Sequence, residues 1–270
     1  MMKRSERLSA IVKILSDSPN QAYSLSYFCQ LFDAAKSSIS EDLQAVKQLL
    51  AKLEIGIIET TSGAGGGVRF IPYISNASCL NLQNHLCERL KDPSRHLAGG
   101  FLYTSDIMFD ASLMKKIACA FARKFQNSGA DYVVTIETKG IAVATMVSDL
   151  LHLPLVVIRR ESRISEGSTI SINYFSGSSD RVQKMSIAKR AVVPGSKALI
   201  IDDFMRAGGS VKGISDILTE FDIKIVGTGI IIVTNEPERK TIPEYSAFVY
   251  LGNINENSKE IHVFPNIQFF

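Results

Sequence analysis

The sequence has none of the long apolar stretches that mark a membrane protein. The longest apolar runs, such as 153–158 and 229–233, are far too short to cross a bilayer. Positive charge near the start of the chain is not followed by an apolar stretch, so we expect no secretory signal peptide. We therefore expect a cytoplasmic protein without a membrane partner.

The cysteines and histidines show no metal-binding pattern. The four cysteines lack the Cys-x-x-Cys spacing of a zinc site, and the four histidines are scattered along the chain. We expect buried or half-buried thiols in a reducing compartment and no metal ligands. The cysteines are Cys29, Cys79, Cys87 and Cys119.

Composition excludes extreme classes of protein and leaves the partner open. Hydrophobic residues make up 46% of the chain and charged residues 21%, which argues against wholesale disorder, a collagen or a coiled coil. The net charge is only +3, from 30 Lys and Arg against 27 Asp and Glu. So small an excess neither favours nor excludes a nucleic acid, and the 270 residues allow one large domain or two smaller ones.

Residues 1–74 have the pattern of three helices and a hairpin. Apolar residues recur every three or four positions in three segments, for which Ser5, then Ser24 or Ser26, then Ser37 or Ser38 are candidate first residues or caps. Two apolar segments, 55–60 and 68–72, flank a glycine-rich turn at 62–67. This order predicts a small α+β winged helix-turn-helix domain.

In that motif the third helix lies in the major groove of DNA, where its exposed N-terminal residues meet bases and phosphates, and the wing reaches a minor groove. The candidate DNA-binding residues are Lys3, Arg4, Lys36, Ser37, Ser38, Ser40, Gln44 and Arg69. A role in protein docking is the alternative, because residues 1–73 hold eight basic and seven acidic side chains. Glu41 and Asp42 would also repel DNA if they faced it.

After residue 74 the pattern changes to alternating strands and helices. Residues 74–84 are polar without clear periodicity and predict a linker or the first turn of the next domain. The apolar runs that follow predict an α/β domain over 75–270, with a parallel sheet covered by helices on both faces. Ligands of such sheets bind beyond the carboxyl ends of the strands. We expect strands at 132–136, 155–158, 198–201, 224–233 and 247–251, and helices at 111–125, 141–151 and 210–221.

The strongest chemical signal is a strand that delivers two acids to a glycine-rich helix start. Asp202 and Asp203 can accept hydrogen bonds from neighbouring sugar hydroxyls, and the helix start offers backbone N–H groups to a phosphate. The stretch resembles the phosphoribosyl pyrophosphate (PRPP) motif of type I phosphoribosyltransferases. The residues carrying this resemblance are Asp202, Asp203, Phe204, Met205, Arg206, Ala207, Gly208, Gly209 and Ser210.

Other segments are consistent with the same resemblance. It implies that the loop of Thr138, Lys139 and Gly140 binds pyrophosphate and that Tyr103 is a candidate to stack on a nucleobase, although core packing is the more usual fate of such a tyrosine. Residues 159–190 hold seven basic and three acidic side chains and resemble the mobile hairpin that closes over the active site in those enzymes. A solvated surface hairpin is the alternative.

A winged helix joined to this domain is similar to the bacterial purine operon repressor family. Residues 34–42 and 202–209 are close to that family's versions, although the family often has Lys at the place of Arg206 and Thr at the place of Ser210. The resemblance implies a homodimer that binds double-stranded DNA at inverted repeats near purine genes. It implies a sensor rather than an enzyme, with no required cofactor. PRPP, with or without magnesium, would lower DNA affinity, and purine nucleotides, including guanosine alarmones, would compete with it.

Two other functions remain open at this stage. The chain could be a catalytic purine phosphoribosyltransferase with a DNA-binding appendage, although the sequence identifies no group that reads a base. It could also use its winged helix to dock a protein.

Overall fold

The computed structural model describes residues 2–61, 63, 66–161, 164–176, 181–255 and 258–270. These residues form two compact units, Met1–Ser75 with Asp149–His152, and Asn76–Ser148 with Leu153–Phe270, and each is described by itself. Residues 62, 64 and 65 of the glycine-rich turn expected at 62–67 lie outside the described residues, as do 162–163 and 177–180 of the basic segment 159–190. No described helix is both long and apolar enough to cross a membrane, and no cluster of three metal-binding side chains occurs among the same residues.

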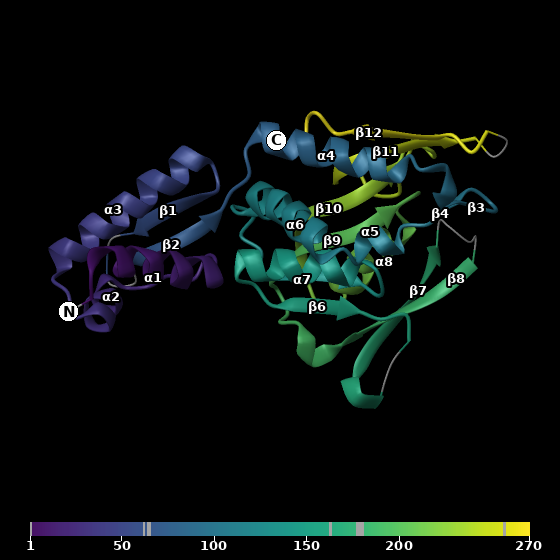
Figure 1. The fold of residues 1–270 in the computed structure, drawn as a ribbon. Helices are drawn as coiled ribbons and strands as arrows, with labels where there is room; N and C mark the ends of the chain where they lie inside the picture. The colour runs from purple at the N-terminus through teal and green to yellow at the C-terminus, as the bar shows by residue number, and fades with distance from the viewer. Residues whose placement is uncertain (1, 62, 64–65, 162–163, 177–180, 256–257) are drawn as a thin grey trace. The chain divides into compact units, whose positions relative to one another are not determined.

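The first unit has the predicted order of three helices and a hairpin (Figure 1). Its elements are α1 (Arg4–Asp17), α2 (Leu25–Phe32), α3 (Lys36–Leu53), β1 (Gly56–Thr61) and β2 (Gly67–Pro72). The two strands are antiparallel, with Ile58 opposite Phe70. One apolar face of each helix is buried in a common core with the hairpin, as the spacing of apolar residues predicts. The core includes Ile11, Leu15, Phe28, Phe32, Ile39, Leu43, Val46, Leu50, Ile58 and Val68.

The starts of these helices are set by local hydrogen bonds. Ser24 caps α2 by accepting a bond from the backbone N of Tyr27 at 3.1 Å. The expectation that Ser5 caps α1 was wrong, because the helix already begins at Arg4. The free N–H of Lys3 is satisfied instead by the Glu6 carboxylate, at 2.7 Å.

The second unit is built on a six-stranded sheet with the order β12-β11-β10-β9-β5-β6. Its strands are β5 (Tyr132–Ile136), β6 (Leu155–Ile158), β9 (Lys197–Met205), β10 (Lys224–Thr234), β11 (Ser246–Ile254) and β12 (Ile261–Pro265). Neighbouring strands are parallel, as predicted, except that β12 runs antiparallel to β11. The edge strand β12 was not expected from the sequence.

Helices cover both faces of this sheet. On one face α6 (Ala111–Phe125) approaches β10 so closely that a Cβ added at Gly229 would lie 2.8 Å from the Phe121 ring. On the other face α8 (Gly209–Thr219) packs its buried side chains against Val134 and Ile200. The crossover helix α7 (Gly140–Leu151) joins β5 to β6. The sheet is therefore buried on both sides, which explains why its strands are continuous apolar runs.

The polar segment after residue 74 is a helix, so the linker interpretation was wrong. Helix α4 (Asn76–Leu90) packs along β11 and β12, where the Gln83 amide donates to the carbonyls of Phe248 and Asn266 at 2.8 and 3.0 Å. Cys79 and Leu86 of this helix are buried. Because a buried glutamine takes part in the docking, the apolar periodicity of α4 is weak in the sequence.

Short elements complete the second unit. A small structure follows α4: the 3-10 helix η1 (Pro93–Arg95), the paired strands β3 (His96–Leu97) and β4 (Phe101–Leu102), and α5 (Ser105–Met108). The predicted basic hairpin forms β7 (Thr169–Ser176) and β8 (Arg181–Ala188), flanked by η2 (Ile164–Glu166) and η3 (Lys189–Ala191). One face of this hairpin is buried, since Tyr174 and Met185 pack against Gly213 of α8.

Candidate functional site

A cavity of about 390 Å³ opens at the carboxyl ends of the parallel strands. Three regions of the sequence predicted to hold ligand contribute to it, namely the loop after β5, the end of β9 and the segment around residue 103. This is the place where parallel α/β sheets bind their ligands. The cavity is lined by Gly100, Phe101, Leu102, Thr104, Lys139, Asp203, Phe204, Arg206, Thr234, Glu236, Leu251, Gly252, Asn253 and Ile254.

The two neighbouring acids are placed differently. The side chain of Asp203 lines the cavity, whereas Asp202 is only 3% exposed and accepts a bond from the Asp203 backbone N at 3.0 Å. A Cβ added at Gly140 would collide with the Asp202 carboxylate and would lie 2.6 Å from the Thr135 hydroxyl. Asp202 is therefore packed against the first residue of α7, and Asp203 alone of the pair lines the cavity.

Burial controls the protonation of this pair. Removal from water raises the pKa of Asp202 well above its usual range, and the charge of Asp203 raises it further. Burial also raises the pKa of Asp203, but the nearby Lys139 charge acts in the opposite direction. Lys139 thus favours the charged form of Asp203, whereas burial and the neighbouring charge disfavour the charged form of Asp202.

The loop after the acids leads into the start of α8, and its residues 207–210 do not line the cavity. Gly208 has a φ of +92°, and a Cβ there would lie 2.8 Å from the Thr241 hydroxyl. The same threonine donates from its backbone N and its hydroxyl to the carbonyl of Ala207, at 2.8 and 3.0 Å. The loop is thus held from outside, and α8 begins at Gly209 with its first N–H groups lacking helical partners.

Side chains of this loop divide between cavity and core. Phe204 and Arg206 line the cavity, but Met205 is 2% exposed and belongs to the core beside α8. Ala207, Gly209 and Ser210 are half-buried at the start of the helix. Strand β9 includes both acids, so the strand predicted to end at residue 201 continues to Met205.

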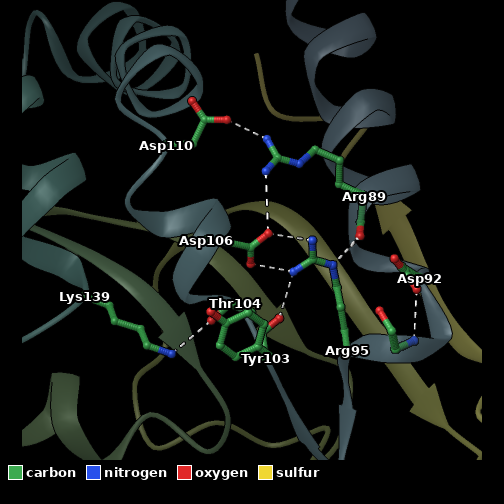
Figure 2. Close-up of polar contacts among 9 residues, drawn as sticks. Arg89, Asp92, Arg95, Tyr103, Thr104, Asp106, Asp110 and Lys139 are labelled. Carbon is green, nitrogen blue, oxygen red and sulfur yellow. Dashed lines mark hydrogen bonds and ion pairs between the residues drawn. The ribbon is translucent and has the colours of Figure 1, made fainter.

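The predicted pyrophosphate loop contributes its lysine. Lys139 lines the cavity, and its Nζ donates to the Thr104 hydroxyl at 3.2 Å (Figure 2). Thr138 is exposed, and its peptide bond to Glu137 is cis. Gly140, at the start of α7, is buried. A cation and a carboxylate thus line one cavity, which suits a ligand with both phosphate and hydroxyl groups.

Several cavity residues were not predicted. The side chain of Tyr103 is 45% exposed and does not line the cavity, whereas its neighbours Phe101, Leu102 and Thr104 do. Thr234 and Glu236 enter from the end of β10, and 251–254 from β11. Their position after two buried parallel strands was the one available signal, because no motif marks them.

The basic segment after β6 is partly neutralised by acids. Arg159 pairs with Glu166 at 2.9 Å and with Glu137 at 3.3 Å. The guanidinium of Arg160 donates to Gln183 of β8 at 2.7 Å, and its charge lowers the pKa values of both buried acids. Arg160 thus links the hairpin electrostatically to the acid pair.

In the first unit, a buried acid joins α1 to α3. Asp42 is 1% exposed and accepts bonds from Arg4 at 3.1 Å and Arg7 at 2.7 Å. Asp42 is therefore neutralised inside the unit. Arg7 is largely covered by this pairing, whereas the Arg4 side chain remains 60% exposed.

The predicted DNA-binding residues are mostly exposed around the start of α3. A shallow depression is lined by Arg4, Ser40, Glu41, Gln44, Ala45 and Gln48. Lys3, Lys36 and Ser37 are exposed and Ser38 is half-buried. On the wing, Arg69 pairs with Glu59 on the facing strand at 2.5 Å, so that its charge is shared with an acid.

Comparison with known proteins assigns both units. Residues 3–72 match the family described as "Bacterial purine repressor, N-terminal", and residues 108–268 match the family described as "Phosphoribosyl transferase domain". The purine biosynthesis transcriptional repressor PurR of Bacillus subtilis is 39% identical over 97% of this chain and 92% of its own. The chain belongs to the bacterial purine repressor family.

Two further relatives show the breadth of the resemblance. The purine biosynthesis transcriptional activator PurR of Lactococcus lactis is 36% identical over 97% of each chain. The xanthine phosphoribosyltransferase of Oenococcus oeni is 34% identical over 54% of the present chain and 72% of its own. Among solved structures, adenine phosphoribosyltransferase from Thermoanaerobacter pseudethanolicus has a TM-score of 0.53 at 14% identity, covering 60% of this chain and 96% of its own. That likeness shows the phosphoribosyltransferase fold of the second unit.

The geometry around Asp202 predicts a steric effect at Gly140. We expect Gly140→Ala to lower the free energy of unfolding by about 1–3 kcal/mol, because the new methyl group must displace a buried carboxylate. Gly252→Ala is the matched control, since its nearest contact is 3.1 Å away on the half-exposed Phe264 ring. Urea unfolding measures both, and equal losses would contradict the steric argument.

The Asp42 pairs predict a stability effect in the first unit. Asp42→Ala leaves Arg7 largely buried without its carboxylate, and we expect a loss of about 3 kcal/mol in unfolding free energy. Asp17→Ala is the control, because its pair with Lys13 is exposed and should contribute less than about 1 kcal/mol. Thermal unfolding compares the two, and a similar fall in Tm would show that the buried pairs contribute little.

Proposed function

We propose that this protein is a DNA-binding transcriptional regulator of purine biosynthesis genes, with PRPP as its effector. The observation that carries the proposal is one cavity lined by Asp203, Lys139 and Arg206, in a chain that begins with a winged-helix unit. The names of its relatives, transcriptional regulators of purine biosynthesis, support the assignment. The phosphoribosyltransferase fold then serves as a sensor rather than as an enzyme.

Each part of PRPP has a chemically matched partner in the cavity region. The Asp203 carboxylate suits the ribose hydroxyls, and the start of α8 from Gly209 suits the 5′-phosphate. Lys139 and Arg206 suit the pyrophosphate group, which needs positive charge. Guanine nucleotides, including alarmones, carry the same sugar and phosphates and would compete for this site.

Regulation requires that PRPP and DNA favour different states of the protein. A ligand shifts such an equilibrium only through its different affinity for the two states, and the effect is reciprocal. We propose that a cytoplasmic homodimer presents two winged helices to an inverted repeat. The DNA contacts then come from Lys3, Arg4, Lys36, Ser37, Ser38, Ser40, Gln44 and Arg69.

The decisive experiment measures operator affinity by fluorescence anisotropy with and without PRPP. We expect PRPP to weaken DNA binding by about tenfold, a typical coupling between two sites. Asp203→Ala should bind DNA normally and lose the response, because the sugar contact is gone. Asp216→Ala is the matched control, since that acid is exposed on α8, pairs with Lys212 and should retain the response. An operator affinity that PRPP leaves unchanged in the unmodified protein would refute the proposal.

An active purine phosphoribosyltransferase is the second candidate, and the identity with a xanthine phosphoribosyltransferase favours testing it. Incubation with PRPP and each purine base decides this, because release of pyrophosphate with formation of a nucleotide would establish the enzyme. For the winged helix, DNA binding that weakens with salt would distinguish phosphate contact from protein docking.

A further inference from the structure

Arg95 holds together the short structure that forms one wall of the cavity. Its guanidinium donates to both oxygens of Asp106 at 2.7 and 2.8 Å, and to the carbonyls of Arg89 at 2.7 Å and Tyr103 at 3.1 Å (Figure 2). The Arg95 carbonyl in turn accepts a hydrogen bond from the backbone N–H of Tyr103 at 2.8 Å. One residue therefore connects α4, the β3–β4 pair and α5.

The strand and turn that Arg95 holds supply the cavity wall. The cavity is lined on this side by Gly100, Phe101, Leu102 and Thr104. Arg95 contacts the same segment through the backbone carbonyl of Tyr103. Thr104 is 5% exposed, and its hydroxyl accepts a hydrogen bond from the Lys139 ammonium at 3.2 Å. The contacts thus run from Arg95 through the 103–104 backbone to the one lysine that lines the cavity among the described residues.

The chemistry of the Arg95–Asp106 pair suits a positioning role. The pair is bidentate, which fixes its geometry, and the Arg95 side chain is only 12% exposed, although the Asp106 side chain is 40% exposed to water. The hydrogen bond from Arg95 lowers the pKa of Asp106, which keeps the carboxylate charged at neutral pH. Arg89 bonds to Asp110 at 2.7 Å and has only a long ion pair with Asp106, at 3.8 Å; among the described contacts its side chain has no hydrogen bond to residues 101–104.

We propose that Arg95 is a positioning residue of the effector cavity, which orders the wall at 101–104 and through Thr104 places the Lys139 ammonium for a pyrophosphate group. The inference rests on the proposed function for the identity of the ligand. The order of the wall itself is independent of that function and is measured separately.

Hydrogen exchange, followed by mass spectrometry of peptides covering 97–104, tests the order of the wall without any ligand. We expect Arg95→Ala to speed exchange in this segment by at least about tenfold. The Tyr103 amide bonds to the carbonyl of residue 95, and without the guanidinium this residue is no longer held against α4 and α5. Asp106→Asn removes the same ion pair with little change in size and should act in the same direction. Arg89→Ala is the matched control and should leave the segment protected, while unchanged exchange in both test variants would overturn the inference.

Calorimetric titration with PRPP tests the link to Lys139. We expect Arg95→Ala to weaken PRPP binding about tenfold and Arg95→Lys to weaken it less, since lysine cannot form the bidentate pair. In a Lys139→Ala background the Arg95 substitution should change affinity less than about twofold, because its effect passes through the absent ammonium. Additive losses in the double variant would show that Arg95 does not act through Lys139.

The two measurements separate the possible failures. If the unmodified protein takes up no PRPP, the proposed function is wrong, and the exchange experiment still decides whether Arg95 orders the wall. If the unmodified protein binds PRPP and Arg95→Ala binds it equally well, the positioning role is wrong and the proposed function stands. Arg89→Ala should retain the PRPP affinity of the unmodified protein in either case.

Discussion

The buried carboxyl group of Asp202 is the constraint on which the cavity at the ends of the parallel strands depends. It accepts the backbone N–H of Asp203 within β9, and it lies so close to Gly140 at the start of α7 that no side chain fits between them. A residue larger than glycine at position 140 would occupy the place of the carboxyl group. The acid that faces the cavity and the loop that carries Lys139 are therefore parts of one packed arrangement rather than two independent loops.

The same burial explains the electrostatics of the cavity. Removing an ionised carboxylate from water is costly, so burial raises the pKa of Asp202, and the charge of Arg160 offsets only part of this rise. Burial also raises the pKa of Asp203, but the charge of Lys139 opposes this rise. The cavity lining carries two cations, Lys139 and Arg206, and two acids, Asp203 and Glu236, so a ligand there meets charges of both signs.

In the winged-helix unit, a buried acid is paired with cations instead. Asp42 is as deeply buried as Asp202, but two arginines of α1 donate to its oxygens. The attraction and hydrogen bonds offset the loss of water around the carboxylate, and the pairs join α1 to α3. As a result, an acid near the start of α3 that would have repelled DNA is withdrawn from the surface. Arg4 is still partly exposed next to it.

Elements with strong apolar periodicity could be predicted from the sequence. Helix α6 and strands β5 and β6 begin and end at the predicted residues, because their apolar positions face a core. The unpredicted elements have mixed burial: α4 docks through Gln83, and β12 alternates buried and exposed residues at the sheet edge. Their positions depend on partners that are distant in the sequence, which local patterns do not contain.

The same division applies to the candidate sites. The motif at 202–210 was visible because strand, acids, glycines and helix follow one another within a few residues. The different roles of Asp202 and Asp203 were not visible, because they depend on Gly140, which is the first residue of α7 and lies about 60 residues away in the sequence. The contacts of Asp42 with Arg7 and of Arg95 with Tyr103 are likewise made across loops and elements. Local sequence therefore indicates which groups a site contains, whereas packing decides which of them face the ligand and which hold the others in place.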